Sequence, residues 1–197
     1  MAANKFLRCG KCLMITAVVA MLGGLAFLYS GLYPMGADVP HNGLTYWGLE
    51  TMRERSISRA ASTIEVPNDL ASSERLLKGA ADYNAMCASC HLKPGKNQSD
   101  FTLGLYPAPP NLAQKGDDHG HDGGHDGGHD DNTYALQRQF WIIKHGIKAS
   151  GMPSWAPGHD DERIWNMVSF LQRLPELSTG QYQVLTARSD NTKKQEH

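Results

Sequence analysis

The stretch Cys87-Ala88-Ser89-Cys90-His91 decides how this chain folds, because it joins two thiols and an imidazole within five residues. Two Cys three positions apart at the end of a helix can each add to one of the two vinyl groups of a haem. The adjacent His then reaches the iron from one side, which is the pattern of c-type haem attachment. The sequence therefore predicts one covalently attached haem c, held by Cys87, Cys90 and His91.

Two other kinds of site use cysteine pairs at this spacing. A zinc site would need two more Cys or His ligands nearby. The only other cysteines, Cys9 and Cys12, belong to an N-terminal segment that is expected to place them across a membrane from this motif, as described below. We assign them no role. A thioredoxin-like redox pair would need a strand–helix–strand setting. Because no alternating strand pattern appears in the sequence, the surroundings favour haem attachment.

The second axial ligand of the iron is predicted by elimination among the eight methionines, five of which belong to the N-terminal region or the segment that follows it. Met86 lies beside an attachment Cys and cannot reach the opposite face of the haem. Met167 lies in the apolar stripe of a predicted helix, where packing is its expected role. Met152 remains, in Ser150-Gly151-Met152-Pro153-Ser154-Trp155. Gly and Pro favour an irregular loop there, from which a thioether can point inward.

Two histidines are rivals of Met152 for this position. His145 lies about 200° around its helix from Ile143 and is expected to face solvent. His159 precedes the last predicted helix and is expected in its cap region. Ligation of the iron by His91 and Met152 would close both axial positions and leave no place for a substrate. A thioether ligand also raises the reduction potential relative to two His ligands. The pattern therefore predicts single-electron transfer.

The N-terminal segment has the composition of a membrane anchor. Lys5, Arg8 and Lys11 precede an uncharged run from Cys12 to Tyr33. As a helix this run is about 33 Å long at about 1.5 Å per residue, and a bilayer core is about 30 Å thick. A cleaved signal peptide is the alternative, but it should have a shorter apolar region and an Ala-x-Ala-like site. The nearest match, Met35-Gly36-Ala37, is poor because Met occupies its first position.

The distribution of basic residues sets the expected orientation of this anchor. Three basic residues precede the span and none follows soon after it, which places the N-terminus in the cytoplasm. We therefore expect a single-pass protein of the inner (cytoplasmic) membrane whose haem domain lies in the periplasm. The membrane lipid is then one partner of the chain, through the anchor.

The predicted domain organisation follows from shifts in composition. The net charge of -1 among 197 residues offers no footprint for nucleic acid, and 41% hydrophobic residues allow a packed core. The expected segments are a cytoplasmic flank 1–11, an anchor 12–34, a periplasmic neck 35–71, a haem domain 72–177 with an insertion 116–131, and a polar tail 178–197. Within the neck, a short helix over 49–61 is expected to expose Arg53, Glu54, Arg55 and Arg59.

Three amphipathic helices are expected in the haem domain, over about 72–88, 133–146 and 160–174. Apolar residues recur in each at helical spacing. Acidic residues from Asp160 to Glu162 favour the start of the third helix, and Pro175 ends it. The expected fold class is therefore all-α: helices around one covalently attached haem, with a transmembrane helix added at the N-terminus. The last dozen residues, 186–197, are polar and expected to fray.

The insertion has a repeating His-Asp-Gly-Gly unit and no apolar residue in DDHGHDGGHDGGHDD, over 117–131. Neutral imidazoles suit Zn, Cu or Ni, so a second metal site for Cu or Zn ions is one interpretation of this segment. A solvated low-complexity insertion is the other. The candidate ligands are His119, His121, His125 and His129.

The chain resembles a class I cytochrome c over about 72–177. The resemblance rests on the CASCH motif (87–91), the GMPSW segment (151–155) and the final helix IWNMVSFLQRL (164–174). Within that class it is similar to the membrane-anchored monohaem cytochromes of proteobacteria. The resemblance implies that the first and last helices cross, and Gly79, Tyr83 and Trp165 fit that crossing.

The resemblance also implies a proline-rich loop after the iron-binding His, with a carbonyl that accepts the ring N–H. Tyr106-Pro107-Ala108-Pro109-Pro110-Asn111-Leu112 fits this loop, with Pro109 and Pro110 as the candidates. Trp155 is expected either to hydrogen-bond a haem propionate or to pack against the haem.

The implied role is a respiratory-chain electron carrier, not an enzyme, whose partners are redox donor and acceptor proteins of the membrane. Haem-copper terminal oxidases are candidate acceptors by analogy alone. Two other functions remain open at this point. One is a peroxidase-type haem enzyme, if Met152 leaves the iron open, and the other is a periplasmic metal-binding module that uses the His-rich loop.

Overall fold

The structure is a computed structural model that describes residues 2–114 and 131–192. It divides into two compact units, Met1–Val39 and Pro40–His197. Every regular element in the described ranges is helical, which confirms the all-α prediction. The elements are α1 (Ala2–Tyr29), α2 (Gly43–Ala61), α3 (Ser73–Asp82), the π-helical turn η1 (Tyr83–Cys87), α4 (Ala88–His91), α5 (Asp100–Gly104), α6 (Asp131–His145), α7 (Asp161–Arg173), the 3-10 turn η2 (Leu174–Glu176) and α8 (Thr179–Thr192).

The first unit contains one long helix, α1. Its segment Gly10–Tyr29 has 20 residues and a mean hydropathy of 2.2, so it is long and apolar enough to cross a membrane. No side chain of this segment is buried. Because lipid can cover such a surface, both the length and the exposure fit the predicted anchor.

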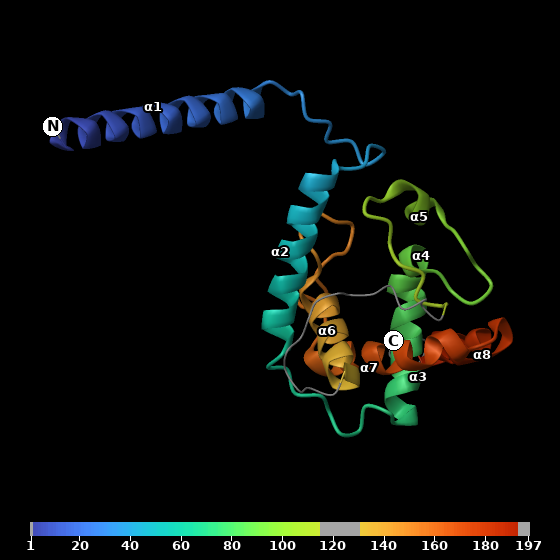
Figure 1. The fold of residues 1–197 in the computed structure, drawn as a ribbon. Coiled ribbons are helices and arrows are strands. Elements are labelled where there is room, and N and C mark those ends of the chain that lie inside the picture. Colours follow the sequence, from blue (N-terminus) through green and yellow to red (C-terminus); the bar gives the residue numbers. More distant parts are fainter. Residues whose placement is uncertain (1, 115–130, 193–197) are drawn as a thin grey trace. The chain divides into compact units, whose positions relative to one another are not determined.

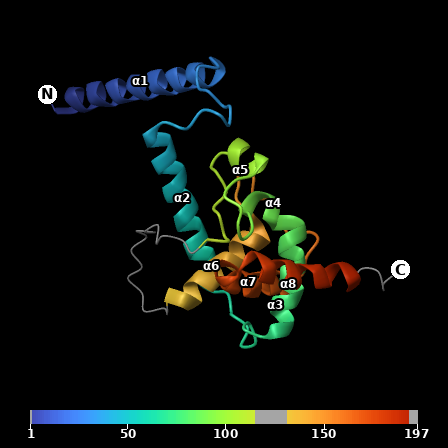
Figure 2. The same cartoon turned by 90° about the vertical axis from the view of Figure 1, so that its right-hand side faces the viewer.

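In the second unit, α3 crosses α7 at very close range (Figures 1 and 2). A Cβ atom placed on Gly79 would lie 1.9 Å from the carbonyl oxygen of Asn166, so only glycine allows this approach. Beside the crossing, Arg163 donates to both carboxylate oxygens of Asp82, at 2.6 and 2.7 Å. Both helices begin close to their predicted starts, where Ser72 accepts from Arg75 N and Asp160 from Arg163 N as caps.

The helix α6 packs against α7 and completes the main core. The Phe140 and Trp165 rings stack with centroids 4.2 Å apart, and Lys144 Nζ pairs with Asp161 at 2.6 Å. The core cluster contains Leu70, Leu136, Phe140, Ile143, Ile164, Trp165, Met167 and Val168. Met167 is therefore a core residue, as its place in the helical stripe predicted.

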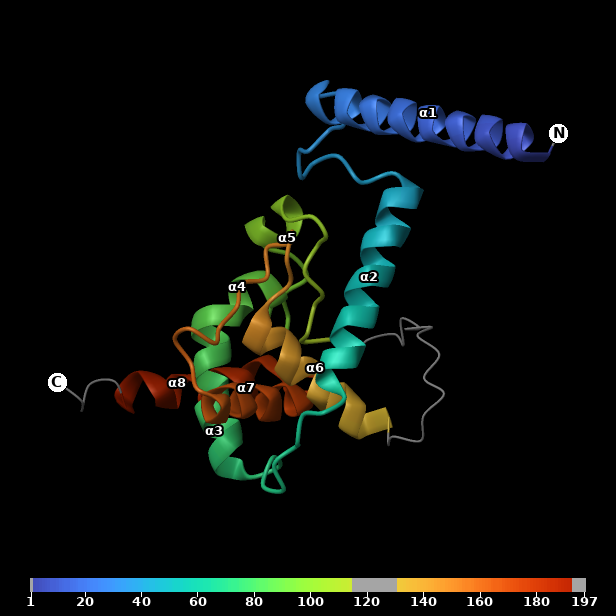
Figure 3. The same cartoon turned by 90° about the vertical axis from the view of Figure 1, so that its left-hand side faces the viewer.

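The segment expected as a neck differs from the expectation, because α2 starts at Gly43 and packs along α6 (Figure 3). Asn42 caps the helix by accepting from Thr45 N at 3.0 Å, which accounts for the early start. Glu54 turns inward and binds Arg138 of α6 at 2.8 Å. The Ser58 and Tyr134 hydroxyls lie 2.7 Å apart. These contacts make α2 part of the second unit.

The C-terminal segment also differs from the expected polar tail, since α8 packs against α3. Tyr182 and Thr186 are buried, and Tyr182 Oη donates to Asn84 at 3.0 Å. The Tyr182 ring lies near Tyr83 and Phe170, with centroids 6.4 and 6.2 Å away. The aromatic cluster, with Leu185 of α8 packed against it, thus holds α8 on the rest of the unit.

The helix crossing yields a stability prediction. We expect Gly79→Ala to lower the free energy of unfolding by about 3 kcal/mol, because the added methyl group meets backbone that has no room to move. Denaturant unfolding followed by haem absorbance measures this change. Gly48→Ala in α2 is the control, since a Cβ there meets nothing within 4 Å and alanine favours helix. Equal stability of the two variants would contradict the close crossing.

The contact between α2 and α6 yields a pH prediction. Burial raises the pKa of Glu54, but Arg138 and Arg53 outweigh this effect, so its pKa lies below the ordinary 4.5. The ionised Glu54 therefore stabilises the folded state fully above its ordinary pKa of 4.5. This stabilisation is lost as the pH falls through the lowered pKa of the folded state. We expect Glu54→Gln to lower the free energy of unfolding by about 1–2 kcal/mol at neutral pH, with a deficit that shrinks on acidification. Exposed Glu74→Gln is the control, and a deficit independent of pH would refute the assignment.

Candidate functional site

One continuous helical run delivers the CASCH motif. It passes from α3 through the π-helical turn η1 into α4, which ends at His91. Cys87 and Cys90 are free, half-buried thiols. Burial, with smaller effects of Asp82 and Cys90, raises the pKa of Cys87 to about 12. The thiol is therefore protonated at neutral pH.

The ring of His91 is fixed by the proline-rich loop. Its Nδ1 lies 3.0 Å from the carbonyl oxygen of Pro110. Because a carbonyl can only accept, Nδ1 carries the proton and Nε2 keeps a free lone pair. The backbone of the same loop is also tied to the motif, since Leu112 N donates to His91 O at 3.1 Å. Burial lowers the pKa of His91 against the opposing effect of Pro110, which favours the neutral, ligating form.

Tyr83 holds the chain immediately after His91. Leu92 has φ 66°, a conformation that disfavours a branched side chain. The Tyr83 hydroxyl lies 2.7 Å from the carbonyl oxygen of Leu92 and 3.2 Å from that of His91, and it donates to this pair. Tyr83 is buried and packs on Phe170 of α7, with ring centroids 5.4 Å apart. The hydroxyl thus stabilises a strained turn that carries the candidate iron ligand.

The loop that contains Met152 folds back onto the end of α6. Ile147 N donates to Met152 O at 3.1 Å, and Trp155 N donates to Ile143 O at 3.3 Å. Gly146 makes this return possible, because it has φ 65° and an added Cβ would lie 2.7 Å from Met152 O. The last carbonyls of α6 therefore find their partners in the loop.

Side chains from the motif and from the Met152 loop meet at one apolar surface. Cys87, Met152, Trp155 and Met86 all pack against the core cluster formed by α6 and α7. The Met152 loop also touches the segment before the proline-rich loop, since a Cβ on Gly151 would lie 2.7 Å from a methyl group of Leu105. The structure thus brings together segments that lie more than 40 residues apart in the sequence.

Trp155 offers a polar atom that no described residue uses. Its Nε1 is buried and has no hydrogen-bond partner within the ranges that the structure covers. His159 packs edge-on against the Trp155 ring and, through Nδ1, lies 3.1 Å from the Trp155 carbonyl oxygen. Its Nε2 is likewise buried and without a partner there. His145 is exposed beside Trp141, as its position on the helix predicted.

For some of the predicted site residues, the described part of the structure shows no contact that supports the predicted role. Pro109 is half-buried, and no specific contact singles it out beside Pro110. Trp165 stacks on Phe140 of α6, while Phe170 provides the aromatic partner of Tyr83 near the crossing. His119, His121, His125 and His129 lie outside the described residues, so metal binding by the His-rich insertion stays a prediction.

Two roles were not predicted from the sequence, that of Gly146 in the return of the Met152 loop and that of the Tyr83 hydroxyl. Gly146 directly follows α6, and a glycine just past the end of a helix is a recognisable C-terminal cap signal. The Tyr83 hydroxyl had no such signal, because its acceptors are main-chain carbonyls eight and nine residues further along the chain.

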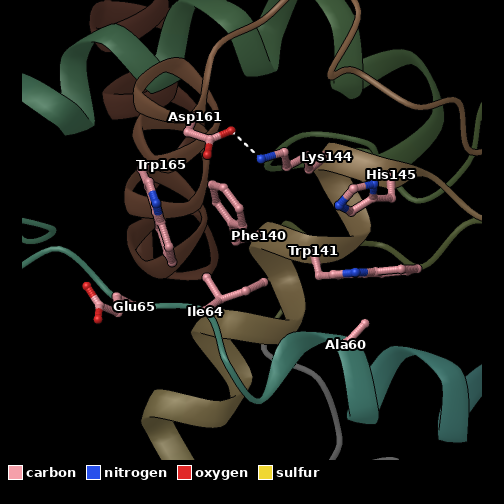
Figure 4. Close-up of a pocket in the computed structure, with 9 residues that line it drawn as sticks. All are labelled: Ala60, Ile64, Glu65, Phe140, Trp141, Lys144, His145, Asp161 and Trp165. Carbon is pink, nitrogen blue, oxygen red and sulfur yellow. Dashed lines mark ion pairs between the residues drawn. The ribbon is translucent and has the colours of Figure 1, made fainter.

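A cavity of about 350 Å³ lies between α2, α6 and α7, away from the motif (Figure 4). The stacked Phe140 and Trp165 rings and the Lys144–Asp161 ion pair form much of its wall. None of Cys87, Cys90, His91 and Met152 lines it. The cavity is therefore a gap beside the docked α2, separate from the candidate haem site.

Comparison with protein families identifies the domain. Residues 74–171 match the family model described as cytochrome C oxidase, cbb3-type, subunit III. This region is a class I cytochrome c. The matched span contains the CASCH motif, the Pro110 carbonyl and the Met152 loop. Searches of curated proteins and of solved structures gave no match.

Covalently bound haem c is the cofactor of this cytochrome, and the donor set fits it. The chain supplies two free thiols at the required spacing and an imidazole whose Nδ1 is already hydrogen-bonded. It also supplies a thioether in a loop that reaches the same apolar surface. The unpartnered Trp155 Nε1 is a donor of the kind that a haem propionate requires.

The contact of Tyr83 with the turn after His91 can be tested. We expect Tyr83→Phe to lower the free energy of unfolding of the holoprotein by about 1–2 kcal/mol, because Leu92 O loses its buried donor. Chemical denaturation followed by far-UV circular dichroism measures this loss. Tyr182→Phe, which removes a hydroxyl from the same aromatic cluster but spares the turn, should be affected less. If Tyr182→Phe were the more destabilised variant, the assigned role of Tyr83 would fail.

Proposed function

We propose that the chain is a membrane-anchored monohaem cytochrome c that carries single electrons in a respiratory chain, with His91 and Met152 as the axial ligands of its iron. The observation that carries this proposal is the hydrogen bond of His91 Nδ1 with Pro110 O. It leaves Nε2 as the free donor atom beside the two attachment thiols. Met152 is supported as the second ligand because its side chain packs on the same apolar cluster as Cys87.

Haem c supplies reversible one-electron chemistry at its iron. The chain's own residues hold the group and limit its rearrangement. Cys87 and Cys90 fix it covalently, and the Pro110 carbonyl orients His91. The apolar core cluster of α6 and α7, on which Met152 packs, would keep water from the haem when it is bound. With two protein ligands the iron has no open position, which favours electron transfer over catalysis at the metal.

The membrane location is proposed from α1. An apolar helix near the N-terminus, preceded by basic residues, supports an inner-membrane anchor with the cytochrome in the periplasm. The proposed partners are redox donor and acceptor proteins of that membrane. The family whose model matches is named for a subunit of a cbb3-type oxidase, and this name supports a terminal oxidase as the acceptor.

Optical spectra of the oxidised and reduced holoprotein test the proposed ligands. We expect a low-spin spectrum with the weak Met–iron charge-transfer band in the oxidised protein. Met152→Ala should abolish that band and lower the reduction potential by on the order of 0.1 V or more, because it removes the thioether ligand.

Met86→Ala is the matched control, since Met86 packs on the same core cluster. It should keep both the band and the potential. If the band survived in Met152→Ala and disappeared in Met86→Ala, Met86 would be identified as the ligand in place of Met152. A high-spin spectrum unaffected by either substitution would contradict His/Met ligation.

A further inference from the structure

Exposed large apolar side chains gather at one end of the unit Pro40–His197, which we call the apolar end. It consists of Leu44, Tyr46, Trp47, Leu49 and Met52 of α2 with Phe101 and Leu103 of α5. All three views place the start of α2 and α5 at the same end of this unit (Figures 1, 2 and 3). Elsewhere in the described part of the unit, Val184 of α8 is the one large apolar side chain of comparable exposure. Such clustering marks an interaction surface.

The two helices of the apolar end are linked through the segments next to them. His41 N, just before α2, donates to Tyr106 Oη at 3.2 Å. The rings of the same two residues meet edge to face, with centroids 5.3 Å apart. Tyr106 follows α5 by two residues. The apolar residues of α2 and α5 are therefore carried by connected parts of the fold.

The charges of α2 leave its exposed positions cationic. Glu50 and Glu54 are half-buried and both pair with Arg53, and Glu54 also pairs with Arg138 of α6. Arg55 and Arg59 are exposed, and they lie about one and two turns beyond Met52. No acidic residue occupies an exposed position of α2. Asp100, at the start of α5, is the acidic residue on the other helix of the apolar end.

We propose that the apolar end inserts into the interfacial layer of the lipid bilayer. Tyr and Trp favour this layer, and a helix that combines exposed apolar residues with arginines is suited to lie in it. Only thirteen residues separate Tyr29, the end of the proposed membrane helix, from Gly43. Together they allow a separation of at most about 50 Å when extended, so the apolar end is tethered close to the bilayer.

This inference rests on the membrane anchoring proposed above, but not on the identity of the iron ligands. Two attachments, the anchor and the apolar end, would restrict rotation of the cytochrome about its tether. The rest of its surface would then face the periplasm in one orientation. Redox partners in the same membrane would meet the domain without a wide orientational search.

Thiol labelling of the full-length holoprotein in nanodiscs tests this proposal. The discs hold one protein each and contain phosphatidylcholine and phosphatidylglycerol, and Cys9→Ser and Cys12→Ser remove the competing thiols. Leu44→Cys, Leu103→Cys and Val184→Cys are compared, because the native side chains are similarly exposed, at 77%, 71% and 62%. The label is a water-soluble maleimide, and each rate is normalised to that of the same variant unfolded in dodecyl sulfate.

We expect Leu44→Cys and Leu103→Cys to react about tenfold more slowly than Val184→Cys, because lipid shields them from the aqueous reagent. Equal rates at all three positions would overturn the proposal. Rates that become slow only after a redox partner protein is added would also overturn it, since the apolar end would then be a protein-docking surface. If the haem absorbance elutes apart from the discs on chromatography, the membrane anchoring itself is contradicted. If it elutes with the discs and the three labelling rates are equal, only the insertion of the apolar end is rejected.

Discussion

The hydrogen bond between His91 Nδ1 and the carbonyl oxygen of Pro110 is the constraint on which the site depends. It selects the tautomer, sets the direction of Nε2 and ties the motif to a loop that follows it by nearly 20 residues. A partner of this kind orients a ligating His and increases its basicity. The Leu112 N–His91 O bond and the Tyr83 hydroxyl hold the backbone carbonyls of His91 and Leu92. The imidazole is thus held in place by the protein alone.

The helices supply the frame to which these loops are attached. Gly79 lets α3 lie directly on the backbone of α7, and this contact fixes the run that ends in the CASCH motif. The helix α6 lies on the same α7 and supplies the carbonyls on which the Met152 loop folds back. His91 is therefore positioned at the end of α4, and Met152 lies in a loop that is hydrogen-bonded to the end of α6.

The sequence predicted the parts that depend on local signals. Asp160 and Ser72 cap α7 and α3 near the predicted starts, because capping needs only neighbouring residues. The place of α2 on α6 was not predicted, since the Glu54–Arg138 pair joins residues far apart in the chain. The start of α2 was missed although Asn42 is a local capping signal. The helix α8 was missed because its composition is polar, and the burial of Tyr182 arises only from packing against α3.

Covalent attachment of haem at the CASCH motif is the central claim, and mass spectrometry of the purified protein tests it most directly. Acidified acetone extracts non-covalent haem, whereas thioether-linked haem should stay with the chain. We predict that a proteolytic peptide containing Cys87, Cys90 and His91 carries the mass of one haem, with both sulfurs modified. A peptide of unmodified mass, with the haem recovered in the solvent, would contradict the account.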